Sequence, residues 1–420
     1  MYTKKTYSNN VIRIGGFAIN TTYEILPDIF YVGGSDRRIE RFENMFPLPH
    51  GVAYNSYLIV DEKTALLDTV DAAISAEYIE NILYVLKGRP LDYLVINHME
   101  PDHCANIEEI LRRFPDVKVI GNTKTFQFFR QYYTMDMSDN CIEVKEGQEI
   151  NLGNHTLRFY MAPMVHWPEV MVTYETTKGI LFSADAFGAF GAISGNIFAD
   201  QVEYDSFYLD EARRYYTNIV GRYGNQVQAL FKKLSGLDIK MICALHGHIW
   251  RGDMIPFILD KYDKWSRYIP EKKGVVLAYG SMYGNTENAV NALAAKLAQR
   301  GIEDIRVYDV SKTHPSYIIA DIFKYSHVVF AAPTYNMNLY FPMDALLREL
   351  AVLNISNRKV ALIGNHTWAS AALKIMTEMI NNMKDMELIG PPLDIKSSLR
   401  ENREQELDDL ADAIYKSMQD

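Results

Sequence analysis

The chain has 420 residues, enough for two or three domains that each bury a core. Hydrophobic residues make up 48% of the sequence and charged residues 23%, as in ordinary globular proteins. The formal net charge of −10 argues against a nucleic acid held through its phosphates. No apolar run approaches the roughly 20 residues that span a bilayer, and residues 1–7 lack the apolar core of a secretory signal. We therefore predict a cytoplasmic protein with no membrane or nucleic-acid partner.

The three cysteines, Cys104, Cys141 and Cys243, form no CxxC pair. This spacing argues against a disulfide framework, a four-cysteine metal site and a fused rubredoxin module. Cys104 lies beside His103, and we interpret it as a small buried hydrophobic residue rather than a ligand.

The first two-thirds of the chain mixes short strand-like runs with a few helical stretches. Residues 52–60 predict a strand that forms a hairpin with residues 64–68. Residues 76–86 have helical spacing of apolar side chains, and residues 203–234 predict a long helix. A helix over 258–269, ended by Pro270, closes this part.

The charged segment Glu271–Gly274 then predicts a domain boundary, with domains at residues 1–270 and 271–420. Beyond it, strands and helices alternate, which indicates a doubly wound parallel sheet. The first helix there has Val290, Leu293 and Leu297 on one face and ends at Gly301. A final surface helix is expected after Glu401. The predicted strands are residues 275–279, 305–308, 328–332 and 360–363.

Side chains that bind metals follow four strand-like runs of the first domain. Because strand ends converge along one edge of a sandwich, we expect these side chains to meet. All offer imidazole or carboxylate and none offers thiolate, which suits iron, manganese or zinc. They are His98, Glu100, Asp102 and His103 after residues 93–96, His166 after 157–162, Asp185 after 180–184, and His246 after 241–245.

Seven donors exceed the needs of one ion. A carboxylate such as Asp185 has two oxygens and can bridge two ions, which at about 3.5–4 Å apart would share one small substrate. A single histidine near a strand end is more often a hydrogen-bonded turn residue. We accept that ordinary interpretation for His50, His155, His314 and His327, and place His248 in the surroundings of the site or on the surface.

The motif His98-x-Glu100-x-Asp102-His103 departs from the HxHxDH motif of metallo-β-lactamase-like hydrolases at Glu100. With His166-Trp167-Pro168, Ser183–Gly188 and Leu245–Gly247, it resembles the flavodiiron proteins. The resemblance implies an αββα metallo-β-lactamase-like sandwich that holds two non-haem irons. One iron would bind His98, Glu100 and His166, and the other Asp102, His103 and His246, with Asp185 bridging. In some family members water displaces the residue that matches His103.

A second motif, Ser281–Thr286, follows the strand at 275–279 and starts a helix. Its hydroxyls, loop N–H groups and helix N-terminus can surround a phosphate. Two further loops follow later strands, where ligands bind in doubly wound sheets, and Tyr335 and Trp368 can stack on a planar ring. His366 either tunes a flavin or is an exposed loop residue. The candidate residues are Ser281, Met282, Tyr283, Gly284, Asn285, Thr286, Pro333, Thr334, Tyr335, Asn336, Asn365, His366, Thr367, Trp368 and Ala369.

These three loops resemble those of the flavodoxins over residues 274–420, which implies FMN. With no GxGxxG fingerprint, a resident NAD site is not supported. Together the resemblances imply an oxidoreductase that reduces O2 to water, NO to N2O, or both, with electrons passed through FMN. They also imply a separate electron donor, such as rubredoxin or another reductase, and a head-to-tail homodimer or homotetramer. Two alternatives are a zinc-dependent hydrolase with a flavodoxin-like appendage and a plain electron carrier with an inert first domain.

Overall fold

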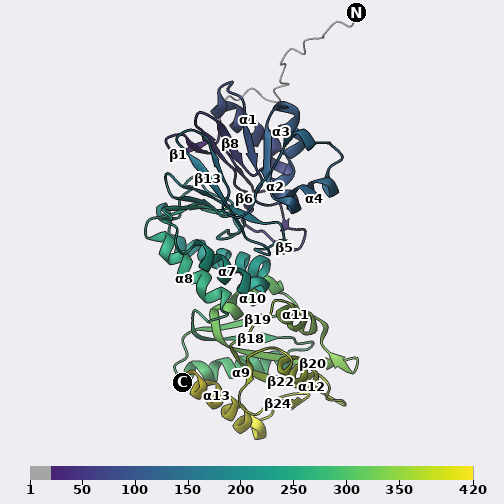
Figure 1. The fold of residues 1–420 in the computed structure, drawn as a ribbon. Coiled ribbons are helices and arrows are strands. Elements are labelled where there is room, and N and C mark those ends of the chain that lie inside the picture. The colour runs from purple at the N-terminus through teal and green to yellow at the C-terminus, as the bar shows by residue number, and fades with distance from the viewer. Residues whose placement is uncertain (1–19, 420) are drawn as a thin grey trace, which may run out of the picture.

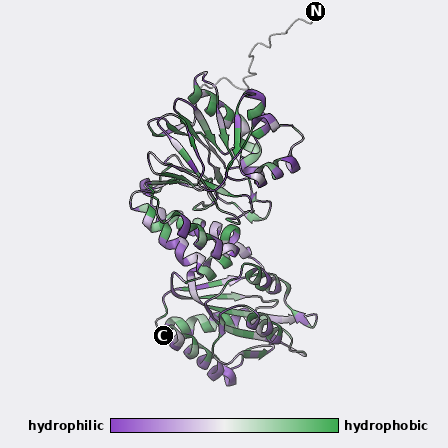
Figure 2. Cartoon of the chain, viewed as in Figure 1, coloured by the Kyte–Doolittle hydropathy of each residue, from purple (hydrophilic) through white to green (hydrophobic). Residues whose placement is uncertain are grey.

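The computed structural model describes residues 20–419 and has two α/β domains arranged end to end (Figure 1). In both domains the strands are mainly hydrophobic, whereas the outer helices combine hydrophobic and hydrophilic residues (Figure 2). Among the residues described, none of the helices combines the length and apolar character needed to cross a membrane. The architecture is the predicted pair of an αββα sandwich and a doubly wound sheet.

Two sheets pack face to face in the first domain. Their shared core includes Ile59, Leu67 and Val95 from one sheet and Phe159 and Phe182 from the other. The first sheet has the order β1 (Tyr23–Leu26), β2 (Ile29–Tyr31), β7 (Tyr57–Val60), β8 (Thr64–Leu67), β9 (Tyr93–Val95), β10 (Lys118–Gly121), β11 (Cys141–Glu143). The second has the order β12 (Glu149–Asn151), β13 (Thr156–Met161), β14 (Met171–Glu175), β15 (Ile180–Phe182), β16 (Met241–Cys243), β17 (Trp250–Arg251).

Helices cover the outer faces of this sandwich (Figure 1). Two small ribbons complete it: β3 (Gly34–Asp36) with β6 (Val52–Tyr54), and β4 (Arg41–Phe42) with β5 (Phe46–Pro47). The helices are α1 (Ser75–Leu86), α2 (Pro101–Cys104), α3 (Ile107–Arg113), α4 (Thr123–Tyr132), α5 (Tyr204–Phe207), α6 (Leu209–Tyr215), α7 (Gly224–Leu234) and α8 (Met254–Ser266).

The predicted hairpin is confirmed, because β7 and β8 pair antiparallel. The predicted strand 52–60 is interrupted at Asn55, whose side-chain amide donates to the carbonyls of Ala244 and Gly247 at 2.9 Å. The single helix predicted over 203–234 is wrong, since π- and 3-10-helical turns separate α6 from α7. Here the chain packs closely on α8, and a Cβ on Gly224 would lie 2.2 Å from the Ser266 carbonyl oxygen.

The second domain contains the expected parallel sheet. β18 (Lys272–Tyr279) pairs in parallel with both β19 (Ile305–Asp309) and β20 (Tyr325–Tyr335). β22 (Arg358–His366) pairs with β20, and both β23 (Met386–Leu388) and β24 (Leu393–Lys396) pair with β22. The remaining elements are β21 (Asn338–Leu339), α9 (Asn285–Gln299), α10 (Pro315–Lys324), α11 (Phe341–Val352), α12 (Ala372–Asn381) and α13 (Glu404–Gln419).

Where the two domains join, α10 packs against α6 and against the π-helical turn that follows α6. Glu271, in the segment predicted as a charged boundary, points inward and forms an ion pair with Arg213. Its carboxylate also accepts from Trp265 Nε1 at 2.9 Å and from Lys261 Nζ at 3.0 Å. Arg214 donates to the Pro47 carbonyl at 2.9 Å and to the Ser316 hydroxyl at 3.2 Å, which ties the β4–β5 hairpin to α10. The junction is therefore built from specific polar contacts.

Candidate functional site

All seven predicted donors come together at one edge of the first domain. His98 and Glu100 follow β9, and Asp102 and His103 lie in the short helix α2. His166 is in the loop between β13 and β14. Asp185 and His246 follow β15 and β16, which pair in parallel and so bring their ends side by side. We call these residues the donor cluster: His98, Glu100, Asp102, His103, His166, Asp185 and His246, none more than 9% exposed.

The first part of the cluster, the His98 subset, consists of His98, Glu100 and His166. Glu100 Oε2 lies 3.1 Å from Nε2 of both histidines. Asp185 Oδ2 faces the same point, at 3.3 Å from His98 Nε2 and 3.0 Å from His166 Nε2. Two imidazole nitrogens and two carboxylate oxygens thus surround one small volume.

The second part, the His246 subset, consists of Asp102, His103 and His246. The Nε2 atoms of the two histidines are 3.0 Å apart, and Asp102 Oδ2 is 3.3 Å from each. Asp185 presents its other oxygen here, with Oδ1 at 3.2 Å from His103 Nε2 and 3.7 Å from His246 Nε2. Asp185 therefore directs one oxygen to each subset, as a bridging carboxylate would.

The donor cluster fits a pair of cations. Both oxygens of Asp102 and Oδ1 of Asp185 are buried without a hydrogen-bond partner among the described residues. Such buried acceptors are costly unless a cation or a proton compensates them. Each subset supplies nitrogen and oxygen atoms within 4.8 Å of one another, and none is a thiolate.

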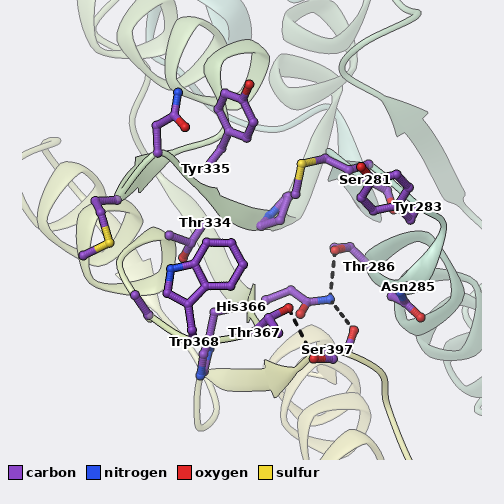
Figure 3. Close-up of a pocket in the computed structure, with 16 residues that line it drawn as sticks. Ser281, Tyr283, Asn285, Thr286, Thr334, Tyr335, His366, Thr367, Trp368 and Ser397 are labelled. Carbon is purple, nitrogen blue, oxygen red and sulfur yellow. Dashed lines mark hydrogen bonds between the residues drawn. The ribbon is translucent and has the colours of Figure 1, made fainter.

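The three predicted loops of the second domain line one cavity of about 520 Å³ (Figure 3). All the predicted flavin residues border it except Gly284, which precedes α9 with φ of +88° and so shapes the loop. Met337 and Ser397 also border it, and were not predicted. Asn365 Nδ2 donates to Thr286 Oγ1 and to the Ser397 carbonyl, both at 3.2 Å, and joins the loops (Figure 3).

This cavity fits a flavin with a single phosphate. Its lining contains hydroxyl, amide and aromatic groups but no lysine or arginine within residues 20–419. The N-terminus of the 15-residue helix α9 opens into it, where backbone N–H groups and the helix dipole favour an anion. Trp368 and Tyr335 project from separate loops into the same opening (Figure 3), and their rings offer stacking surfaces.

Comparison with known proteins matches both domains. A model described as ODP family beta lactamase matches residues 52–247, and the flavodoxin model matches residues 277–407. The nitric oxide reductase of Moorella thermoacetica is 34% identical over 371 residues, covering 88% of this chain and 91% of that protein. The chain belongs to the flavodiiron protein family.

Solved structures of this family have the same fold. The rubredoxin:oxygen oxidoreductase of Desulfovibrio gigas superposes with a TM-score of 0.89 at 27% identity, over 95% of this chain and 98% of that chain. A mutant flavo di-iron protein of Thermotoga maritima gives 0.86 at 27% identity, over 94% and 98%.

Electrostatics make the donor cluster of this flavodiiron protein a strong cation site. Burial opposes ionisation of Asp185, but the neighbouring His103 and His98 outweigh it and hold the pKa of that carboxyl well below its usual range. Burial likewise works against a charged His166, yet hydrogen bonds to Asp185 and Glu100 raise its pKa to about 9. Metal cations would take the place of these protons on the histidines.

Residues that the sequence did not single out support the cluster from behind. Glu169 accepts from His98 Nδ1 at 2.7 Å, and the carbonyl of Ala53 accepts from His246 Nδ1 at 2.8 Å. Asp68 accepts from the backbone N–H groups of Asn97 and His98. Asp68 directly follows β8, whereas Ala53 lies within β6 and Glu169 in the loop before β14. The sequence carries no signal for these roles, because the partners lie far away along the chain.

An aromatic wall adjoins the His246 subset. The rings of Phe42, Tyr54 and Tyr215 lie 5.3, 5.6 and 5.3 Å from the His246 ring, centroid to centroid. The Tyr215 hydroxyl is buried without a partner among the described residues. The wall thus covers the His246 subset with buried aromatic rings.

Three of the four histidines set aside as structural serve the fold. His155 pairs with Glu175 at 3.0 Å, His314 accepts from the Ser316 N–H at the start of α10, and His327 lies 2.8 Å from the Ser417 hydroxyl. His248 is buried between Tyr204 and Tyr208, so its surface placement is excluded. Burial lowers the pKa of His248 to about 4.

Proposed function

We propose that this chain reduces O2 to water, NO to N2O, or both, at a pair of non-haem iron ions, using electrons that enter through FMN. The observation that carries the proposal is Asp185, which turns one oxygen toward each subset of the buried donor cluster. Two relatives point the same way, since one is named a nitric oxide reductase and another a rubredoxin:oxygen oxidoreductase.

In this proposal the His98 subset holds one iron, the His246 subset holds the other, and Asp185 bridges them. Bound irons would supply electrons and open coordination positions for O2 or NO, and FMN would deliver single electrons from the donor. The protein orients the Nε2 atoms of His98 and His246 through the hydrogen bonds that their Nδ1–H groups donate, and keeps the substrate dry behind the aromatic wall. Holding two small molecules side by side removes much of the entropic cost of joining them.

FMN would be bound by the loops at Ser281–Thr286, Pro333–Asn336 and Asn365–Ala369. The first loop and the start of α9 would hold the phosphate, and Tyr335 and Trp368 would contact the ring system. We place the division between the two functional domains at residues 270 and 271.

We further propose a head-to-tail homodimer or homotetramer served by a separate donor such as rubredoxin. Aromatic side chains at the mouth of the flavin cavity support an interface there, because Tyr283 is 91% and Trp368 89% exposed. Gel filtration with an active monomer would contradict the assembly. The predicted cytoplasmic location belongs to the same proposal and is tested by cell fractionation.

The decisive experiment is anaerobic. The protein is reduced, and its consumption of O2 and of NO is compared with its measured iron and FMN content. Activity that scales with two irons and one FMN per chain supports the proposal. Two zinc ions per chain with hydrolysis of a thioester or lactone, and no consumption of either gas, would restore the hydrolase alternative, which the comparisons do not favour.

A further inference from the structure

The histidines of the donor cluster differ in what supports their outer ring nitrogen. His98 Nδ1 donates to a carboxylate, Glu169 Oε1, at 2.7 Å, and both side chains are fully buried. His246 Nδ1 donates to a neutral carbonyl, that of Ala53, at 2.8 Å. His103 Nδ1 is buried and has no hydrogen-bond partner in the described part of the chain. One subset therefore has a negative charge directly behind it, and the other has none in the corresponding place.

Glu169 is held firmly in this position. The same oxygen accepts from the Met99 N–H at 2.9 Å, and the Glu169 carbonyl accepts from Asn122 Nδ2 at 2.6 Å. Asn122 is itself fixed, because it caps the N-terminus of α4. With few alternative positions open to it, the Glu169 carboxylate sets both the tautomer and the orientation of the His98 ring.

The charge has a direct consequence for a bound metal. A carboxylate that accepts from a metal-binding imidazole makes the opposite ring nitrogen a stronger donor. In a buried site the added negative charge also favours the more positive ion, because little solvent screens it. A backbone carbonyl gives only a weaker, dipolar form of this effect, and His103 Nδ1 has no acceptor of either kind among the described residues.

We propose that Glu169 is a positioning residue that makes the two metal positions unequal. The ion in the His98 subset is the tightly held one and the one at which the ferric state is favoured. The ion in the His246 subset leaves first and is the more easily kept ferrous. The inference rests on the metal ligands of the proposed function. It adds a ranking of the two metal positions by affinity and by preference for the ferric state, which the ligands alone do not give.

The test removes only the charge. Glu169→Gln keeps an oxygen that accepts from His98 and Met99. The matched control is Glu175→Gln, at the opposite end of β14, where a buried glutamate accepts from His155 Nδ1 at 3.0 Å without touching the donor cluster. Metal-free protein is loaded with Co²⁺, and release to a chelator is followed by the visible spectrum of the bound cobalt.

In the unaltered protein we expect one fast and one slow release per chain. Glu169→Gln accelerates the slow phase by about tenfold to a hundredfold, the usual effect of losing such a partner, and leaves the fast phase and FMN content unchanged. Glu175→Gln leaves both phases unchanged. An unaltered slow phase in Glu169→Gln, or equal acceleration of both phases, overturns the proposal.

Iron gives a second readout. In ⁵⁷Fe-loaded diferric protein, Glu169→Gln shifts the Mössbauer doublet of one iron and leaves the other, whereas a merely structural role would shift both or neither. If the glutamine variant does not fold, Glu169→Asp keeps the charge but places the carboxylate farther from His98. The rate of its slow phase should lie between the rates of the unaltered protein and of His98→Ala. A slow phase as fast as that of His98→Ala contradicts the proposal.

The outcomes separate this inference from the proposed function. Cobalt release involves no redox chemistry. Unequal release in a protein that consumes neither O2 nor NO refutes the proposed function and leaves the ranking, whereas gas consumption with equal release refutes the ranking alone.

Discussion

The two functional regions of the molecule solve the problem of binding in opposite ways. The donor cluster gathers three carboxylates and four histidines, none more than 9% exposed. The flavin cavity uses neutral hydroxyls, amides and a helix N-terminus, and its aromatic rim is largely exposed. The first depends on charges that the fold has buried, whereas the second depends on loops that the fold leaves open.

This difference determines where folding and function oppose each other. Buried, partly unpartnered carboxylates destabilise a protein unless protons or cations compensate them. The donor cluster therefore lowers the stability of the metal-free chain and regains it by binding metal. An exposed tryptophan contributes little to folding, so the flavin cavity can be altered without loss of the fold.

The largest effect is expected from His98→Ala combined with His246→Ala, which removes one donor from each subset. Metal content should fall below one ion per chain and gas consumption by at least about a thousandfold, since the chemistry depends on the metals. FMN content should be unchanged because the cavity lies in the other domain. Elemental analysis and an oxygen electrode measure this; retained consumption would identify the first domain as an inert scaffold.

The sequence predicted the donors better than their surroundings. His98, His166 and His246 each follow an apolar run, and strand ends in a sandwich converge, so their meeting was predictable. The partners of their outer nitrogens were not, because Glu169 and Ala53 lie far in the sequence from the histidines they contact and meet them only through tertiary packing. Ser397 was missed in the flavin cavity for a similar reason, as it reaches the loops only once β24 pairs with β22.

Element boundaries failed where tertiary contacts override local propensity. The stretch 203–234 has helical spacing, yet π- and 3-10-helical turns interrupt it. Directly after them Gly224 packs so closely on α8 that a Cβ there would meet the Ser266 carbonyl. Glu271 belongs to the charged segment predicted as a domain boundary, and its side chain forms a buried ion pair with Arg213. A charged residue in the sequence does not reveal whether an oppositely charged side chain lies beside it in the fold.

The junction between the two regions provides a third case, a buried carboxylate fully satisfied by the protein. Although burial opposes it, Arg213, Trp265 and Lys261 lower the pKa of Glu271 to about 2 from an ordinary 4.5. Glu271→Gln should therefore cost about 3 kcal/mol of unfolding free energy near neutral pH.

The pH dependence of that cost follows from the sign of the shift. A carboxyl with a lowered pKa stabilises the fold fully above 4.5 and loses the contribution as pH falls through about 2. Denaturant titrations should show the two proteins converging on acidification. Glu387→Gln is the control, because its ion pair with Lys359 is exposed and should be worth well under about 1 kcal/mol. A constant difference at every pH would mean that packing, not charge, holds the junction.

A smaller effect is expected from Thr286→Val at the start of α9. The substitution keeps the volume of a buried side chain but removes the hydroxyl that accepts from Asn365 and faces the cavity. We expect FMN affinity to fall about tenfold, the cost of one hydrogen bond to a charged group, with metal content unchanged. Fluorescence titration of the flavin-free protein with FMN measures the affinity. A parallel loss of metal would show that the two regions are coupled through the fold.

The smallest effect is expected at the exposed aromatic rim of the flavin cavity. Trp368 is 89% exposed, so Trp368→Ala should leave the unfolding temperature of the flavin-free protein within about one degree. FMN affinity should fall about fivefold, because a stacked aromatic ring contributes about 1 kcal/mol beyond the area it covers. Met337→Ala is the control, since Met337 borders the same cavity and is 67% exposed but has no ring. Equal losses in the two variants would assign the effect to covered area, and a drop in the unfolding temperature with Trp368→Ala alone would show that the rim supports the fold and is not a free surface.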